Sequence, residues 1–230
     1  MSQPKSYVRS SDGATMVEVE PHQYVNAKIL QLQGRSAGGK VTAQELAAGR
    51  SELERWQTPA AFIAKVKELG ERVKSDKLFN LTTVKFLLDA MVLAEFVKFR
   101  PTEMVRLVEQ RAEWPDGQIG TRKNPANIEI TEAMEVGRKR GDEYRNPQQP
   151  QDVTAEDLHR RAKAIPEQLE KAIQQKADKG YSHKCVLVVY LNIVNHGVLQ
   201  KESEAGIANV KAKYANDFQG ICVLWQGKLF

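Results

Sequence analysis

Two acidic residues near the middle of the chain have the spacing of a metal-binding pair. Asp116 lies in the segment WPDGQIG and Glu129 in the segment IEITEA, with a short link between them. Because strand side chains alternate, Ile128 and Ile130 share one face, and Glu129 and Thr131 share the other. A hairpin-like connection would bring Asp116 beside Glu129, and two close carboxylates repel unless a cation lies between them. Their hard oxygens suit Mg²⁺ or Mn²⁺, with waters and substrate phosphate completing the shell.

Near residue 100 the spacing of apolar residues changes from that of helices to the alternation of strands. Three helical patterns precede that point, at about 42–56, 58–75 and 81–99. Short strands follow at about 104–110, 116–120 and 127–134, then a helix over 154–180 that we expect Pro166 to interrupt. A strand over 184–193, a helix over 200–218 and a strand over 220–230 complete the order. Short connections favour antiparallel pairing, and helical connections favour parallel pairing. We therefore expect an α/β fold: one mixed sheet flanked by helices.

Proline–aspartate, a gap and then a short strand carrying glutamate resembles the PD-(D/E)xK nuclease superfamily. The element order from residue 85 to 228 is also similar to its restriction endonuclease-like core. The resemblance implies metal-dependent hydrolysis of phosphodiesters in nucleic acid. It implies that Asp116 and Glu129 bind the metal and that the backbone carbonyl of Ile130 is a third ligand. A glutamate on the helix before the sheet sometimes contributes, and Glu95 and Glu103 are the candidates.

The chain departs from this family at one catalytic position. Thr131 stands where the family has a lysine that positions or activates the attacking water and stabilises developing negative charge. A threonine hydroxyl is neutral and cannot supply that charge. Two functions therefore stay open: an active enzyme whose cation comes from another position, or an inactive nuclease-like fold that binds nucleic acid or protein. The candidate cations are Lys123, Arg138, Lys139 and Arg140.

The segment GRKRGDEYR, residues 137–145, is a second candidate for contact with nucleic acid. Its three consecutive cations could contact phosphates, and Tyr144 could stack on a base. The alternative is a solvated loop whose charges pair with neighbouring acids. An alternative also exists for WPDG, in which proline and Asp-Gly only form a turn and Glu129 is an exposed strand residue.

Composition describes an ordinary globular chain of 230 residues with a net charge of +5 and a pI of about 9.1, compatible with a polyanionic partner. We expect a flexible tail over residues 1–20, a helical region over 21–84 and the nuclease-like core over 85–230. No signal peptide or membrane-spanning run is recognisable, so we expect no membrane partner and a cytoplasmic location. Cys185 and Cys222 lie in apolar runs and are interpreted as buried, unpaired residues in a reducing compartment.

Overall fold

The computed structural model describes residues 6–8, 15–20, 23–26, 41–73, 84–109, 114–138, 153–180 and 185–230. The first three of these ranges are the strands β1 (Ser6–Val8), β2 (Thr15–Glu20) and β3 (Gln23–Asn26) of a small antiparallel sheet. Two of them fall inside residues 1–20, where the sequence predicts a tail, and the third falls inside the region expected to be helical. The alternation in TMVEVE is the local signal for β2.

The main sheet has six strands in the order β4-β5-β6-β7-β8-β9. Its strands are β4 (Met104–Leu107), β5 (Gly117–Gly120), β6 (Pro125–Met134), β7 (Val186–Asn192), β8 (Gly220–Trp225) and β9 (Lys228–Leu229). The pairs β4–β5, β5–β6 and β8–β9 are antiparallel, whereas β6–β7 and β7–β8 are parallel. Helices α7 (Ala155–Ala177) and α8 (Gln200–Lys213) make the two parallel crossovers. The mixed sheet expected from connection lengths is confirmed.

The helices before the sheet begin where their capping residues predict. In α2 (Ala43–Leu53), Thr42 and Glu45 form a reciprocal capping box. In α3 (Pro59–Arg72), Thr58 accepts a hydrogen bond from the Ala61 N–H and proline occupies the first turn. The third helix, α5 (Lys85–Phe99), ends before Pro101, which cannot continue it.

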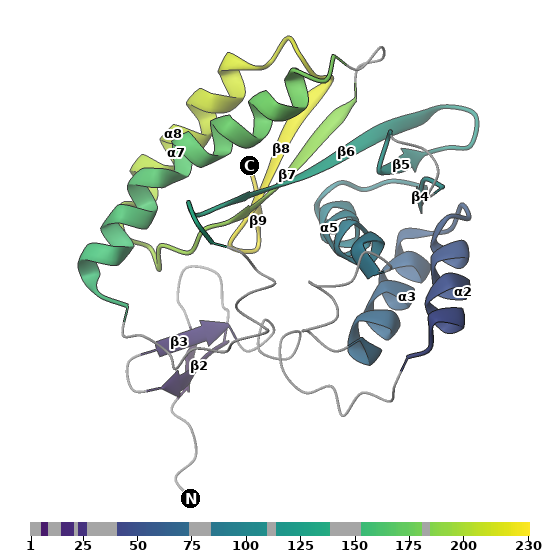
Figure 1. The fold of residues 1–230 in the computed structure, drawn as a ribbon, viewed down its shortest axis with the longest axis horizontal. Helices are drawn as coiled ribbons and strands as arrows, with labels where there is room; N and C mark the ends of the chain where they lie inside the picture. The colour runs from purple at the N-terminus through teal and green to yellow at the C-terminus, as the bar shows by residue number, and fades with distance from the viewer. Residues whose placement is uncertain are drawn as a thin grey trace, which may run out of the picture.

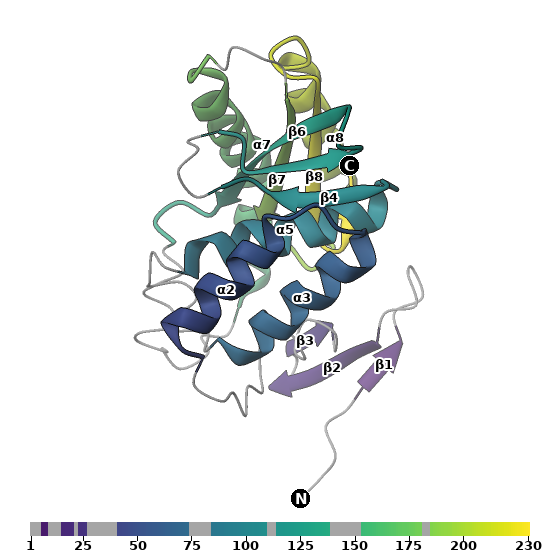
Figure 2. The ribbon, with the colours of Figure 1, turned by 90° about the vertical axis from the view of Figure 1, so that its right-hand side faces the viewer.

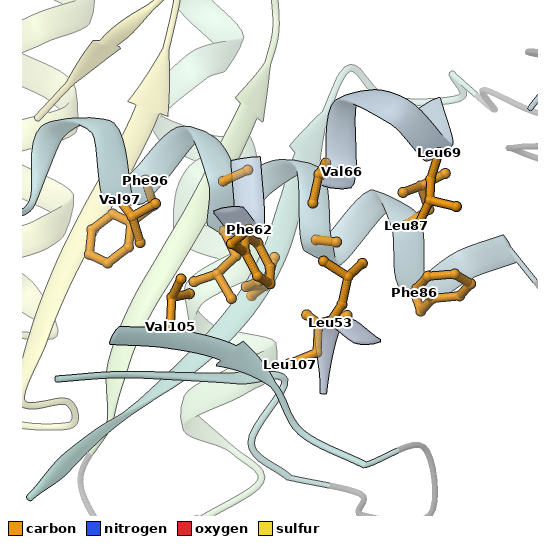
Figure 3. Close-up of a cluster of buried hydrophobic side chains, with 14 of the residues drawn as sticks. Leu53, Phe62, Val66, Leu69, Phe86, Leu87, Phe96, Val97, Val105 and Leu107 are labelled. Atoms are coloured by element: carbon orange, nitrogen blue, oxygen red, sulfur yellow. The ribbon is translucent and has the colours of Figure 1, made fainter. Parts of the chain in front are cut away.

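Helices cover both faces of the sheet and divide the buried side chains into two clusters (Figure 1, Figure 2). On one face, α2, α3 and α5 pack together and against the strands, so the residues before 85 share a core with those after it. Figure 3 draws part of this cluster, including Leu53, Phe62, Leu87, Val105 and Leu107. On the other face, α7 and α8 pack against β7 and β8 through Ile165, Leu169, Ile173, Leu187, Val189 and Val223.

Helix α7 runs unbroken through Pro166, so the interruption expected there is wrong. The proline instead lies at the contact with α8. A Cβ added to Gly206 of α8 would lie 2.5 Å from the Pro166 Cγ atom, so α8 approaches α7 at a position where only glycine fits. Tertiary packing between the two helices therefore overrides the proline's local preference.

Membrane-spanning helices and disulfides are the two features of the fold that bear on its compartment. Within the described ranges, no helix is long and apolar enough to span a bilayer. Cys185 is buried, Cys222 is half-buried, and both are free thiols. Cys185 immediately precedes β7, Cys222 lies in the neighbouring strand β8, and no disulfide joins them.

Candidate active site

Strand register determines the direction of Glu129 and brings Asp116, just before β5, next to it. Gly117 lies opposite Ile128, and residues directly opposite in an antiparallel pair share a face. That face is the α5 side, because a Cβ on Gly117 would lie 2.7 Å from the Leu93 Cδ2 atom of α5 and Ile128 is buried in the same cluster. Glu129 therefore projects toward the α7 side, whereas Asp116 precedes β5 and interacts with Asp89 of α5 as well as with Glu129.

Just before β5 begins, the Asp116 side chain takes the place of a backbone acceptor for β6. Its Oδ2 atom accepts a hydrogen bond of 2.7 Å from the backbone N–H of Ile130. The N–H and C=O of a strand residue project from the same edge, so the Ile130 carbonyl also lies on the Asp116 side of β6. The aspartate, the glutamate and this carbonyl thus come from one short stretch of the sheet.

Glu129 is a buried carboxylate that pairs with a lysine from α7. Its side chain is 3% exposed, and Lys176 Nζ lies 2.5 Å from Glu129 Oε1 with its own side chain 16% exposed. Lys176 lies in the last turn of α7, 47 residues after Glu129 in the sequence. The pair joins the strand at the centre of the sheet to the helix that covers it. Removing either partner of such a buried pair leaves the other without its compensating charge.

A third acid, Asp89 of α5, interacts electrostatically with Asp116. Burial and then the Asp116 charge raise the pKa of Asp89 to about 7. Burial and then the Glu129 charge raise the pKa of Asp116, while the Ile130 N–H, Lys176 and Lys85 lower it. Asp116 thus interacts with two other acids, Asp89 and Glu129, and a positive charge beside it would favour its ionised form.

Trp114 packs the chain just before Asp116 against the α7 side of the sheet. Its ring packs partly buried against the cluster under α7, two residues before Asp116. The thiol of Cys185, at the start of β7, interacts with both Trp114 and Glu129. Burial raises the pKa of that thiol to about 11, so Cys185 stays protonated at neutral pH and serves as packing. WPDG is therefore more than a turn, because it anchors Asp116 against β6.

Of the other site residues predicted from the sequence, only Thr131 lies on the same strand face as Glu129 among those that the structure describes. Thr131 follows Glu129 on the same face and is half-buried opposite Val189 of β7. Lys123 is exposed at the tip of the β5–β6 hairpin. Arg138 lies beyond the far end of β6, where its Nη1 atom donates to the Asn192 carbonyl at 3.0 Å. Lys139, Arg140 and Tyr144 lie outside the described residues.

Neither expected glutamate on the preceding helix reaches the pair. Glu95 forms an ion pair with Lys98 on the helix surface, and Glu103 is exposed in the loop before β4. Asp89 of the same helix does interact with Asp116. Its sequence signal is a charged residue on the buried stripe of α5, between Phe86 and Leu93.

Lys176 was not predicted from the sequence to belong to the site, although its position on α7 indicates it in the same way. It continues the buried stripe of α7 three residues after Ile173 and seven after Leu169, so it must face the sheet. The candidate cations predicted from the sequence all lie near Thr131 along the chain. A cation delivered by a helix on the covering layer is distant in sequence and close in space.

The donor set fits a hard divalent cation held by a carboxylate pair. Within the described ranges, no group of three or more His, Cys, Asp or Glu side chains is arranged to hold a metal ion. Mg²⁺ in particular is held by one or two carboxylates with waters and substrate phosphates completing its shell. Asp116, Glu129 and the Ile130 carbonyl meet that requirement with oxygen ligands alone. Burial raises the pKa of Asp116 most, the Glu129 charge raises it further, and a bound cation would offset the second of these causes.

Comparisons with protein-family models, with curated proteins and with solved structures find no match to this chain. Any assignment of function therefore depends on the geometry and chemistry of the site itself.

Proposed function

We propose that the chain hydrolyses phosphodiester bonds in nucleic acid with a PD-(D/E)xK-like site on a restriction endonuclease-like core. The observation that carries this proposal is the Lys176–Glu129 pair beside Asp116. It supplies the carboxylates and the cation of such a site, with the cation moved from β6 to α7. Cys185 and Cys222, both free, fit a reducing compartment such as the cytoplasm.

Asp116, Glu129 and the Ile130 carbonyl would hold the metal, and Asp89 would add negative charge from the α5 side. Mg²⁺ or Mn²⁺ bound there would neutralise phosphate charge and make a bound water more acidic. The Ile130 N–H orients Asp116 by its hydrogen bond, so one carboxylate oxygen is fixed in direction. These residues together set where the substrate phosphate must sit.

Lys176 would supply the charge that Thr131 cannot. Its ammonium has three N–H donors, and the contact with Glu129 Oε1 uses one of them. The remaining donors can orient an attacking water or stabilise the extra negative charge of the transition state. The short contact to Glu129 fixes the position of this charge, so little reorganisation is required during reaction.

A catalytically inactive fold that binds nucleic acid or protein is the second candidate. The same ion pair favours it in one respect, since Lys176 already neutralises a carboxylate that a metal would otherwise meet. The two candidates differ in a measurable property: the hydrolytic site requires metal and both carboxylates, and the inactive module requires neither.

The test is cleavage of labelled single-stranded and duplex oligonucleotides with Mg²⁺ or Mn²⁺. We expect Asp116→Asn, Glu129→Gln and Lys176→Gln each to reduce the cleavage rate by about 10²-fold or more, because each removes charge placed at the reacting phosphate. EDTA should abolish cleavage by the unaltered protein.

Each variant has a control that makes the same chemical change elsewhere on β6 or α7. Glu132→Gln alters the same strand on the opposite face, Lys171→Gln removes an exposed cation from α7, and Asp178→Asn alters the end of that helix. All three should cleave at the unaltered rate. Metal-independent cleavage, or cleavage that survives Glu129→Gln, would reject the hydrolytic site.

A further inference from the structure

A row of polar side chains crosses three strands on the outer part of the sheet. Arg106 of β4 lies opposite Gln118 of β5, and Gln118 lies opposite Asn127 of β6. The Arg106 Nε and Nη2 atoms donate to Gln118 Oε1 at 3.0 and 2.8 Å, and Gln118 Nε2 donates to Asn127 Oδ1 at 2.9 Å. The three side chains therefore act as one connected unit.

This row lies on the sheet face that carries the proposed site. Val105 and Leu107 are buried in the cluster with α5, so Arg106 between them projects to the opposite face. Gln118 is two residues after Asp116 in β5, and Asn127 is two before Glu129 in β6. Two residues of strand span about 7 Å, so the row runs directly beside the carboxylate pair.

The direction of these hydrogen bonds determines what the row can bind. Arginine has only donors, so the Gln118 oxygen must face Arg106 and its amide nitrogen must face Asn127. The Asn127 oxygen then faces Gln118, and its amide N–H groups point away from the row. Within the row both amide oxygens accept, and the N–H groups left over are those of Asn127, the second amide N–H of Gln118 and the remaining ones of the Arg106 guanidinium. Such a set of donors with one positive charge complements an anion.

The row is held in place and is not covered by a described helix. Arg106 stacks over the ring of Trp56 with its Cζ atom 5.1 Å from the ring centroid, which restrains the guanidinium plane. Helices α7 and α8 lie over the β6–β8 part of the sheet, whereas β4 and β5 extend beyond them (Figure 1). All three side chains of the row are half-buried. Arg122 and Lys123, both exposed, add positive charge at the adjacent hairpin tip.

We propose that the Arg106–Gln118–Asn127 row binds backbone phosphates of a nucleic-acid strand next to the bond that the Asp116–Glu129 site cleaves. This inference rests on the proposed function, because it takes nucleic acid as the ligand. A nucleic-acid strand that crosses the row passes from the cationic hairpin tip toward the carboxylate pair. The contacts are to phosphate oxygens, so they position the strand and carry no base preference.

Binding of fluorescein-labelled single-stranded and duplex DNA, measured by fluorescence anisotropy in EDTA, tests this inference without hydrolysis. Asn127→Asp keeps the side-chain shape and replaces N–H donors with negative charge. Arg106→Met removes the guanidinium and keeps an apolar stem against Trp56. We expect each to weaken binding about tenfold, because a charge-assisted phosphate contact is lost. The slope of log affinity against log salt should also fall by about one for Arg106→Met.

Charge-matched controls separate a local contact from a change in overall charge. Asn209→Asp on α8 and Arg160→Met on α7 alter exposed residues by the same chemistry and should bind as the unaltered protein does. The inference is overturned if the unaltered protein binds neither oligonucleotide, or if row and control variants bind alike. Failure of this inference can be distinguished from failure of the hydrolytic site. If Glu129→Gln loses cleavage while the row variants bind DNA as the unaltered protein does, the row alone is rejected. Binding that depends on the row in a protein without cleavage rejects hydrolysis alone.

Discussion

Lys176→Met should destabilise the protein because it leaves the Glu129 carboxylate buried without its cation. The Glu129 side chain is 3% exposed, and the Lys176 side chain is 16% exposed. Breaking a buried pair by removing one partner costs about 3–5 kcal/mol. Because Lys176 partly reaches solvent, and water can enter its place, we expect the lower end, about 3 kcal/mol. For a chain of this length that corresponds to a fall in Tm of roughly 6–12 °C.

The charge itself, and not the lost packing, should account for most of this cost. Adding Glu129→Gln to Lys176→Met removes the buried charge, so the double variant should recover about 2 kcal/mol relative to the single one. Glu129→Gln alone keeps an acceptor for Lys176 and should cost only about 1 kcal/mol. This recovery on adding a second substitution is the signature of a buried ion pair.

The assay is equilibrium unfolding in guanidinium chloride followed by circular dichroism, with midpoints compared at a common m value. Lys171→Met, on the exposed side of the same helix, is the control and should stay within about 0.5 kcal/mol of the unaltered protein. A stabilising buried pair is refuted if Lys176→Met unfolds at the same midpoint as Lys171→Met. It is also refuted if the double variant is no more stable than Lys176→Met.

Two further variants test the neighbouring acid and the helix packing. The pKa of Asp89 is raised from 3.8 to about 7, so its contribution to stability is complete below about pH 4 and is lost as pH rises through 7. Asp89→Asn should therefore match the unaltered protein near pH 4 and exceed its stability by about 2 kcal/mol at pH 8, in unfolding measured at both pH values. Gly206→Ala should cost about 1–3 kcal/mol because its Cβ meets Pro166, whereas Gly70→Ala, which meets only the flexible end of a methionine, should be neutral or stabilising. Equal thermal midpoints for the two alanine variants would contradict the packing described between α7 and α8.

The sequence predicted the sheet well because its signals were local. The alternation in IEITEA and the apolar run of β7 each depend on a few neighbouring residues. Pro166 was misjudged because its effect depends on Gly206, forty residues later, which no local rule includes.

The site was only partly predictable for the same reason. Asp116 and Glu129 come from adjacent strands joined by a short hairpin, so their proximity followed from alternation and connection length. Lys176 and Asp89 come from helices on opposite faces of the sheet, and their approach depends on tertiary packing. Lys176 and Asp89 are both charged residues at positions where a helix otherwise has buried apolar side chains. This pattern can be recognised in the sequence once the sheet-facing side of each helix is known.

Binding of Mn²⁺, measured by isothermal titration calorimetry, tests the proposed hydrolytic site most directly, because metal binding separates it from an inactive fold. We expect one site in the unaltered protein that is lost in Asp116→Asn and retained in Asp178→Asn. We also expect a stabilisation of about 2.7 kcal/mol at a metal concentration 100 times the Kd, again lost in Asp116→Asn. The same heat of binding in all three proteins, or none in any, would contradict a metal site at Asp116 and Glu129.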